Sequence, residues 1–65
     1  MPLGTVTAFD PLKGLGTITA EGGAEYVFHV IEIEDGSRSI EIGRTVDFEP
    51  LARFGRFEAG KVTKA

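Results

Sequence analysis

Two arginines alternate with two phenylalanines near the C-terminus, in Arg53-Phe54-Gly55-Arg56-Phe57. Flat guanidinium groups and aromatic rings both stack on nucleic-acid bases, and arginines also bind phosphates. The same segment has a structural interpretation, in which Phe57 and Phe54 pack at one end of the fold and both arginines are solvated. The sequence leaves these two interpretations open.

A second candidate for phosphate contact is Lys13, which lies in the segment Lys13-Gly14-Leu15-Gly16. Glycines allow a nucleic-acid backbone to approach closely, but they also suit a turn followed by the start of a strand. The segment is not a nucleotide-binding P-loop, because the glycine spacing and the Lys-Ser/Thr pair of that motif are missing. Lys13 is therefore a candidate ligand for a phosphate of a polynucleotide.

Residues suited to catalysis or metal binding are scarce. The chain has no cysteine, so disulfides and thiolate metal sites are excluded. Its one histidine, His29, has no serine or cysteine nucleophile context, and we interpret it as a base contact or an exposed strand residue. The acidic residues of the middle segment read as a solvated face; they are Glu32, Glu34, Asp35 and Glu41. We expect no enzyme activity, no cofactor and no metal.

The 65 residues form one expected domain, residues 1–65, with a formal net charge of −3. That charge weighs against nucleic-acid binding, since phosphate contacts supply much of the affinity. Residues 53–65, however, carry four basic residues against one acidic residue. No stretch approaches the roughly 18 apolar residues of a membrane span, and no signal peptide is recognisable. We therefore expect a cytoplasmic protein without a membrane partner.

Nine glycines and three prolines divide the chain into short segments with alternating polarity. The alternation predicts five strands, over residues 5–9, 15–20, 25–30, 44–51 and 57–63, with a long connection over residues 31–42. Pro50 is expected at an edge or a strand end. The side chains expected to face inward are Val6, Ile18, Tyr26, Phe28, Val30, Ile40, Val46, Phe48 and Val62.

An open sheet of five short strands would leave exposed edges, which closure into a barrel removes. The strand count and the long third connection favour an all-β fold, a five-stranded antiparallel OB-fold barrel. An SH3-like barrel is the alternative, because its strand statistics are similar.

Three segments, in order along nearly the whole chain, resemble the cold-shock domain family. They are Gly4-Thr5-Val6 leading to Phe9-Asp10, then Lys13-Gly14-Leu15-Gly16-Thr17-Ile18, then Tyr26-Val27-Phe28-His29-Val30. The resemblance implies an OB-fold barrel that binds single-stranded RNA or DNA on one sheet face. In that family, exposed aromatic rings stack on bases and basic side chains follow the backbone.

Several aromatic and basic positions of the family are replaced in this chain. Leu15, Thr17, Val27 and Val30 stand where the family has phenylalanine. Ala8 replaces a tryptophan, Thr5 and Thr7 replace lysines, and the family's loop aromatic would fall near Ser37. Each lost stacking position costs about 1–3 kcal/mol, out of the about 12 kcal/mol of a nanomolar complex. We therefore expect weak binding.

The resemblance and the basic C-terminal segment together define the expected nucleic-acid site. Its residues are Lys13, Phe9, Leu15, Thr17, Val27, His29, Arg53, Phe54 and Arg56. A protein-interaction module or a homodimer on the same barrel is the alternative function. It is favoured by an aliphatic sheet face on a negatively charged chain.

Overall fold

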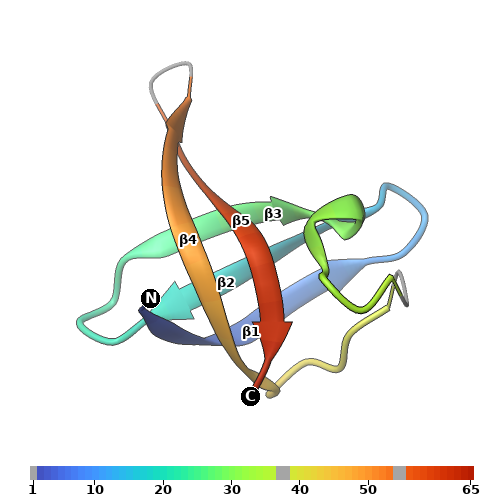
Figure 1. Cartoon of the computed structure of the whole chain (residues 1–65), viewed down its shortest axis with the longest axis horizontal. Coiled ribbons are helices and arrows are strands. Elements are labelled where there is room, and N and C mark those ends of the chain that lie inside the picture. Colours follow the sequence, from blue (N-terminus) through green and yellow to red (C-terminus); the bar gives the residue numbers. More distant parts are fainter. Residues whose placement is uncertain (1, 37–38, 54–55) are drawn as a thin grey trace.

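The structure, a computed structural model, describes residues 2–36, 39–53 and 56–65, apart from the side chains of Arg53 and Arg56. Its elements follow the order strand, strand, strand, short helix, strand, strand (Figure 1). They are β1 (Leu3–Asp10), β2 (Leu15–Ala20), β3 (Glu25–His29), the 3-10 helix η1 (Val30–Glu32), β4 (Thr45–Arg53) and β5 (Arg56–Lys64). The five predicted strands are confirmed, with β1, β4 and β5 longer than expected.

The strands close into a barrel in the order β1-β2-β3-β5-β4. Neighbouring strands are antiparallel except β3 and β5, which run parallel and pair at Val27 and Glu58. Figure 1 shows β1, β2 and β3 as one layer, crossed in front by the hairpin of β4 and β5. The all-β five-stranded barrel predicted from the sequence is therefore confirmed, with one parallel contact that alternation cannot reveal.

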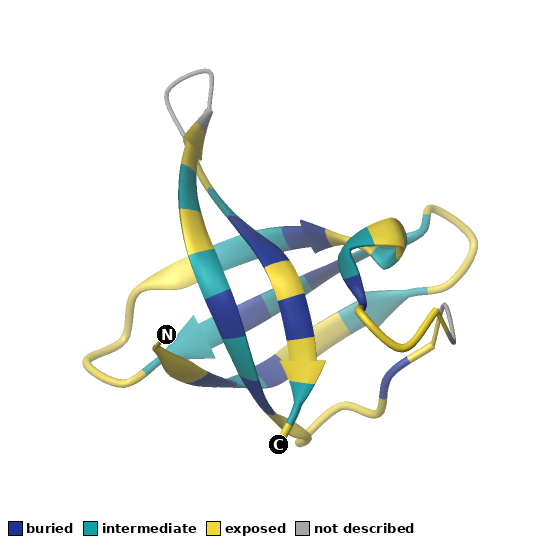
Figure 2. Ribbon diagram, viewed as in Figure 1, coloured by how far each residue is buried: buried dark blue, intermediate teal, exposed yellow. Residues whose placement is uncertain are grey.

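The core is a cluster of aliphatic side chains with two phenylalanines. Figure 2 marks the buried positions along the ribbon in dark blue. Its buried residues are Val6, Ile18, Phe28, Ile33, Ile40, Val46, Phe48, Ala59 and Val62. Burying each of the larger apolar side chains stabilises the fold by about 1.5–3 kcal/mol. Seven of the nine residues expected to face inward belong to this cluster, and Tyr26 packs against it while partly buried.

The expected long connection over residues 31–42 is confirmed, since no strand lies between β3 and β4 in the described residues, and the short helix η1 begins it at Val30. Val30 was expected in the third strand and the core, but it lies in η1 and is half-buried. Ile33 is buried and forms an isolated parallel bridge with Val62. Ile31 and Ile33 alternate with two glutamates in the same way, yet Ile31 is exposed, so the sequence does not reveal that Ile33 belongs to the core.

A β-bulge in β1 decides which of its side chains face outward. The pairing with β2 shifts between Val6 and Ala8, so Thr7 has no direct partner there. Strict alternation after the buried Val6 would direct Ala8 inward. The extra residue instead leaves both Thr7 and Ala8 exposed, while Phe9 packs against the core.

Pro50 was expected at an edge or a strand end, and the structure places it inside β4 at an edge. β1 pairs with β4 only from Thr45 to Asp47, so the stretch around Pro50 pairs with β5 alone. That stretch is an edge, and a proline is tolerated there because one side of the strand forms no backbone hydrogen bonds with a neighbouring strand.

Candidate nucleic-acid interface

Two rows of directly opposed residues cross the outer face of β1, β2 and β3. The rows are Asp10–Leu15–His29 and Ala8–Thr17–Val27. Opposed residues on neighbouring strands point to the same face of a sheet. The structure therefore brings four of the expected site residues together: Leu15, Thr17, Val27 and His29.

A hollow of about 370 Å³ lies on this face. It is lined by Ala8, Phe9, Asp10, Lys13, Leu15, Gly16, Thr17 and Val27. Five of these were expected from the sequence, and His29 lies beside them as the cross-strand partner of Leu15. The lining combines the half-buried Leu15, Thr17 and Val27 with two charged residues, Lys13 and Asp10. The apolar groups suit the flat face of a ligand, and Lys13 suits a negative charge on it.

The loop that carries Lys13 is fixed by Asp10, a residue that was not among the expected site residues. The Asp10 carboxylate Oδ1 accepts hydrogen bonds from the backbone N–H groups of Leu12, at 3.0 Å, and Lys13, at 3.3 Å. The Gly14 N–H donates to the Asp10 carbonyl, and Gly14 has a φ of 69°, which favours glycine. An Asp-Pro pair before a Lys-Gly pair is the sequence signal for such a turn.

Phe9 faces the core, unlike the expected site residues on the outer face. It belongs to an inward-facing row with Gly16 and the buried Phe28. Its ring stacks on Phe28, with centroids 6.3 Å apart and planes inclined by 12°. Phe9 thus supports the floor of the hollow from within, and contact between its edge and a ligand stays a prediction.

His29 and Glu58 meet on the outer face where β3 runs beside β5. The His29 Nε2 atom lies 4.0 Å from the Glu58 Oε1 atom, too far for a hydrogen bond. The side chain of His29 is 50% exposed, whereas that of Glu58 is 15% exposed. Sequence reasoning missed Glu58, because only the parallel pairing of β3 and β5 brings it beside Val27.

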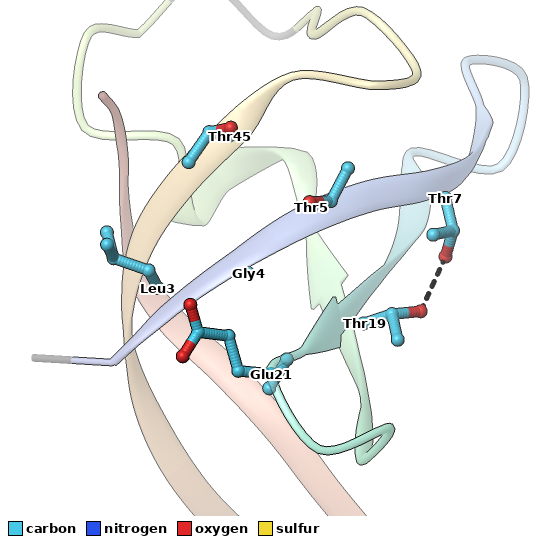
Figure 3. A pocket seen from close by; sticks show the side chains of 8 residues that line it. Leu3, Gly4, Thr5, Thr7, Thr19, Glu21 and Thr45 are labelled. Atoms are coloured by element: carbon cyan, nitrogen blue, oxygen red, sulfur yellow. Dashed lines mark hydrogen bonds between the residues drawn. The ribbon is translucent and has the colours of Figure 1, made fainter.

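A second hollow, of about 400 Å³, lies further along β1 and β2 and reaches β4 (Figure 3). Its walls carry four threonines, Thr5, Thr7, Thr19 and Thr45, and the Thr7 and Thr19 hydroxyls lie 3.0 Å apart. Glu21 is the one charged residue among those that line it. A lone carboxylate repels phosphate. This hollow therefore adds surface to the face but no positive charge.

The expected site residues of the β4–β5 hairpin are placed only in part. Phe54 lies outside the described residues, and so do the side chains of Arg53 and Arg56, whose backbones end β4 and begin β5. Phe57 is 61% exposed and meets the edge of Tyr26, with centroids 6.0 Å apart. Tyr26 in turn contacts Phe48, at 4.9 Å between centroids. The structural interpretation of Phe57, as a ring packed at the barrel end, is consistent with these contacts.

Other kinds of site find little support in the described ranges. Within them, no group of three or more His, Cys, Asp or Glu side chains is arranged to hold a metal ion. No helix in the same residues has the length and apolar character needed to cross a membrane.

Comparison with known proteins gives a consistent result. The family model of the 'Cold-shock' DNA-binding domain matches residues 3–65. The cold shock-like protein CspLB of Listeria monocytogenes is 38% identical over 65 residues, which cover 98% of each chain. The cold shock-like protein CspA of Stigmatella aurantiaca is 45% identical over 51 residues, 75% of each chain. Among solved structures, Drosophila Unr CSD456 matches with a TM-score of 0.82 and 28% identity, over 98% of this chain and 26% of that one.

Proposed function

The chain belongs to the cold-shock domain family, and we propose that the outer face of β1, β2 and β3 binds single-stranded RNA or DNA. It is a nucleic-acid-binding domain of that family and not an enzyme. The observation that supports this site best is the hollow in which Lys13 stands at one end of a floor that includes Leu15 and Val27.

The chemistry of that hollow suits an unpaired nucleotide. The Lys13 ammonium group contacts a phosphate. The hydrogen bonds from Asp10 to the backbone of this turn hold the Lys13 main chain in place. Leu15, Thr17 and Val27 offer methyl groups to the face of a base, and His29 offers an imidazole ring beside Leu15. Unpaired bases are accessible to such contacts, whereas bases inside a duplex are stacked on each other.

The same residues make the binding weak. Aromatic stacking contributes about 1–3 kcal/mol per base. On this face aliphatic side chains stand at most of the stacking positions, and they offer a base only apolar contact. The net charge of −3 also opposes the approach of a polyanion. We therefore expect dissociation constants in the micromolar range, with binding that weakens as the salt concentration rises.

A titration with labelled oligonucleotides tests the proposal. Fluorescence anisotropy of short pyrimidine-rich RNA and DNA strands is measured against increasing protein at low salt, with a duplex of the same length as the control. Saturable binding of the single strands, with weaker binding of the duplex, supports the proposed function. No change in anisotropy up to hundreds of micromolar protein rejects it.

A protein-interaction or homodimerising module is the second candidate. It is supported by the aliphatic character of Leu15 and Val27, which suits a protein surface as well as a base. This candidate requires concentration-dependent association or a specific protein partner, and it predicts that Leu15→Asp abolishes the association while leaving the barrel folded.

A further inference from the structure

One of the two rows of opposed residues on the outer face continues onto a fourth strand. Ala8, Thr17 and Val27 are opposed across β1, β2 and β3, and Val27 is in turn opposed to Glu58 of β5. Neighbouring strands lie about 4.8 Å apart. The Glu58 carboxylate is therefore within reach of the edge of a base whose face rests on Val27.

The position of this carboxylate is constrained by its surroundings. The Glu58 side chain is mostly buried, and its Oε1 atom lies 4.0 Å from Nε2 of the half-exposed His29. Its register with Val27 places Glu58 on the outer face, between β3 and β5. The 4.0 Å separation between His29 Nε2 and Glu58 Oε1 is too long for a hydrogen bond, so His29 does not occupy the lone pairs of that oxygen. Lys13 and Glu58 thus stand on different sides of the face, one on the loop between β1 and β2 and the other on β5.

A carboxylate at the edge of a base discriminates by chemistry. It accepts hydrogen bonds and donates none, so it attracts an exocyclic amino group and repels an exocyclic carbonyl oxygen. Cytosine presents the N4 amino group where uracil presents the O4 oxygen. The two pyrimidines are alike in size and in the apolar area of their faces. They also differ at N3, which carries a donor hydrogen in uracil and none in cytosine, so the preference for cytosine requires that the carboxylate meets the exocyclic group.

We propose that Glu58 makes this face select bases that carry an exocyclic amino group, and cytosine over uracil among the pyrimidines. The inference rests on the proposed function and names the base preference of the same site. Lys13 then fixes the phosphate side of the strand, and Glu58 reads the outer edge of the base that lies on Val27.

The test compares two RNA hexamers, one of cytidine and one of uridine, by anisotropy titration at neutral pH with the full chain. We expect the cytidine hexamer to bind about tenfold more tightly, which is the size of effect for one well-placed base contact. Glu58→Gln keeps the size of the side chain and adds an amide that both donates and accepts. This variant is expected to bring the ratio of the two affinities close to one.

Glu34→Gln is the matched control, because it removes the same charge from an exposed residue of the turn after η1. It is expected to raise both affinities slightly and to leave their ratio unchanged. Equal affinities of the two hexamers for the wild-type chain would overturn the inference while leaving the proposed function intact. A preference that survives Glu58→Gln would also overturn it. Failure of both hexamers and of all other single strands to bind would instead reject the proposed function.

Discussion

Phe9 and Phe28 stack on each other across the backbone of Gly16, with ring centroids 6.3 Å apart. The two rings come from β1 and β3, and β2 passes between those strands at a residue without a side chain. This arrangement joins the core to the floor of the candidate site, because Phe28 is buried and Phe9 lines the hollow. Its integrity therefore determines both the stability of the barrel and the shape of the face.

Gly16→Ala is expected to destabilise the protein. A Cβ atom at this position would overlap the Phe28 ring and lie 3.0 Å from the Ala8 carbonyl oxygen. Overpacking of this kind costs about 1–3 kcal/mol, and each kcal/mol lowers the melting temperature of so small a domain by about 4–8 °C. Thermal unfolding followed by circular dichroism measures the change.

Phe28→Leu provides the second half of that experiment, because a smaller side chain makes room for the added methyl group. The double variant should lose less stability than the sum of the two single losses, since the residues are in contact. A melting temperature of Gly16→Ala equal to that of the wild type would contradict the packing described here.

Leu15→Phe combined with Thr17→Phe is expected to strengthen oligonucleotide binding. Both residues lie on the outer face and line the hollow, so the new rings would be exposed where bases are proposed to lie. At about 1–3 kcal/mol per stacked base, the affinity for a pyrimidine hexamer should rise at least tenfold. Anisotropy titration gives the value.

Ile42→Phe serves as the control for that pair, because it adds a ring to an exposed residue of the loop before β4. It should leave the affinity unchanged. If the double variant folds and its affinity equals that of the wild type, the outer face of β2 is not where single strands bind.

Lys13→Gln should reduce the salt dependence of binding. A lysine that neutralises one phosphate contributes about 0.7 to the slope of log affinity against log salt for a single strand. The slope should fall by that amount in the variant, together with a uniform loss of affinity across sequences. Lys61→Gln is the comparison, since the Lys61 Nζ atom already pairs with Glu49 at 3.5 Å on β4. An unchanged slope in Lys13→Gln would remove Lys13 from the site.

The oligomeric state separates the two candidate functions. If the outer face binds nucleic acid, the chain should sediment as a monomer of 7.0 kDa over the concentrations used in the titrations. A reversible dimer that is lost in Leu15→Asp would instead support the protein-interaction alternative. Analytical ultracentrifugation at several concentrations distinguishes the outcomes.

The sequence predicts the faces of β2 and β3 well, because their alternation is regular. Ile18 and Phe28 are buried, and Leu15, Thr17 and Val27 share the outer face as expected. Phe9 shows where this reasoning fails, since one extra residue at Thr7 reverses the direction of every later side chain in β1. Propensity and pattern do not reveal a bulge, so the orientation of Phe9 required the structure.

Nonlocal pairing explains the remaining differences. Ile33 joins the core through its bridge with Val62, and Glu58 reaches the site through its pairing with Val27. Each contact joins residues about thirty positions apart, beyond the range of any local pattern. The basic hairpin was evident from the sequence, but its contribution to binding stays a prediction because Phe54 lies outside the described residues.

The parallel contact between β3 and β5 is the seam of the barrel, joined in the described residues at the single register position of Val27 and Glu58. Amide hydrogens along such a seam are expected to exchange with solvent sooner than those of the long β4–β5 ladder. A nucleotide that rests on Val27 and bonds to Glu58 would hold both sides together. Slower deuterium uptake in β3 and β5 would then show that the ligand stabilises the contact that closes the barrel.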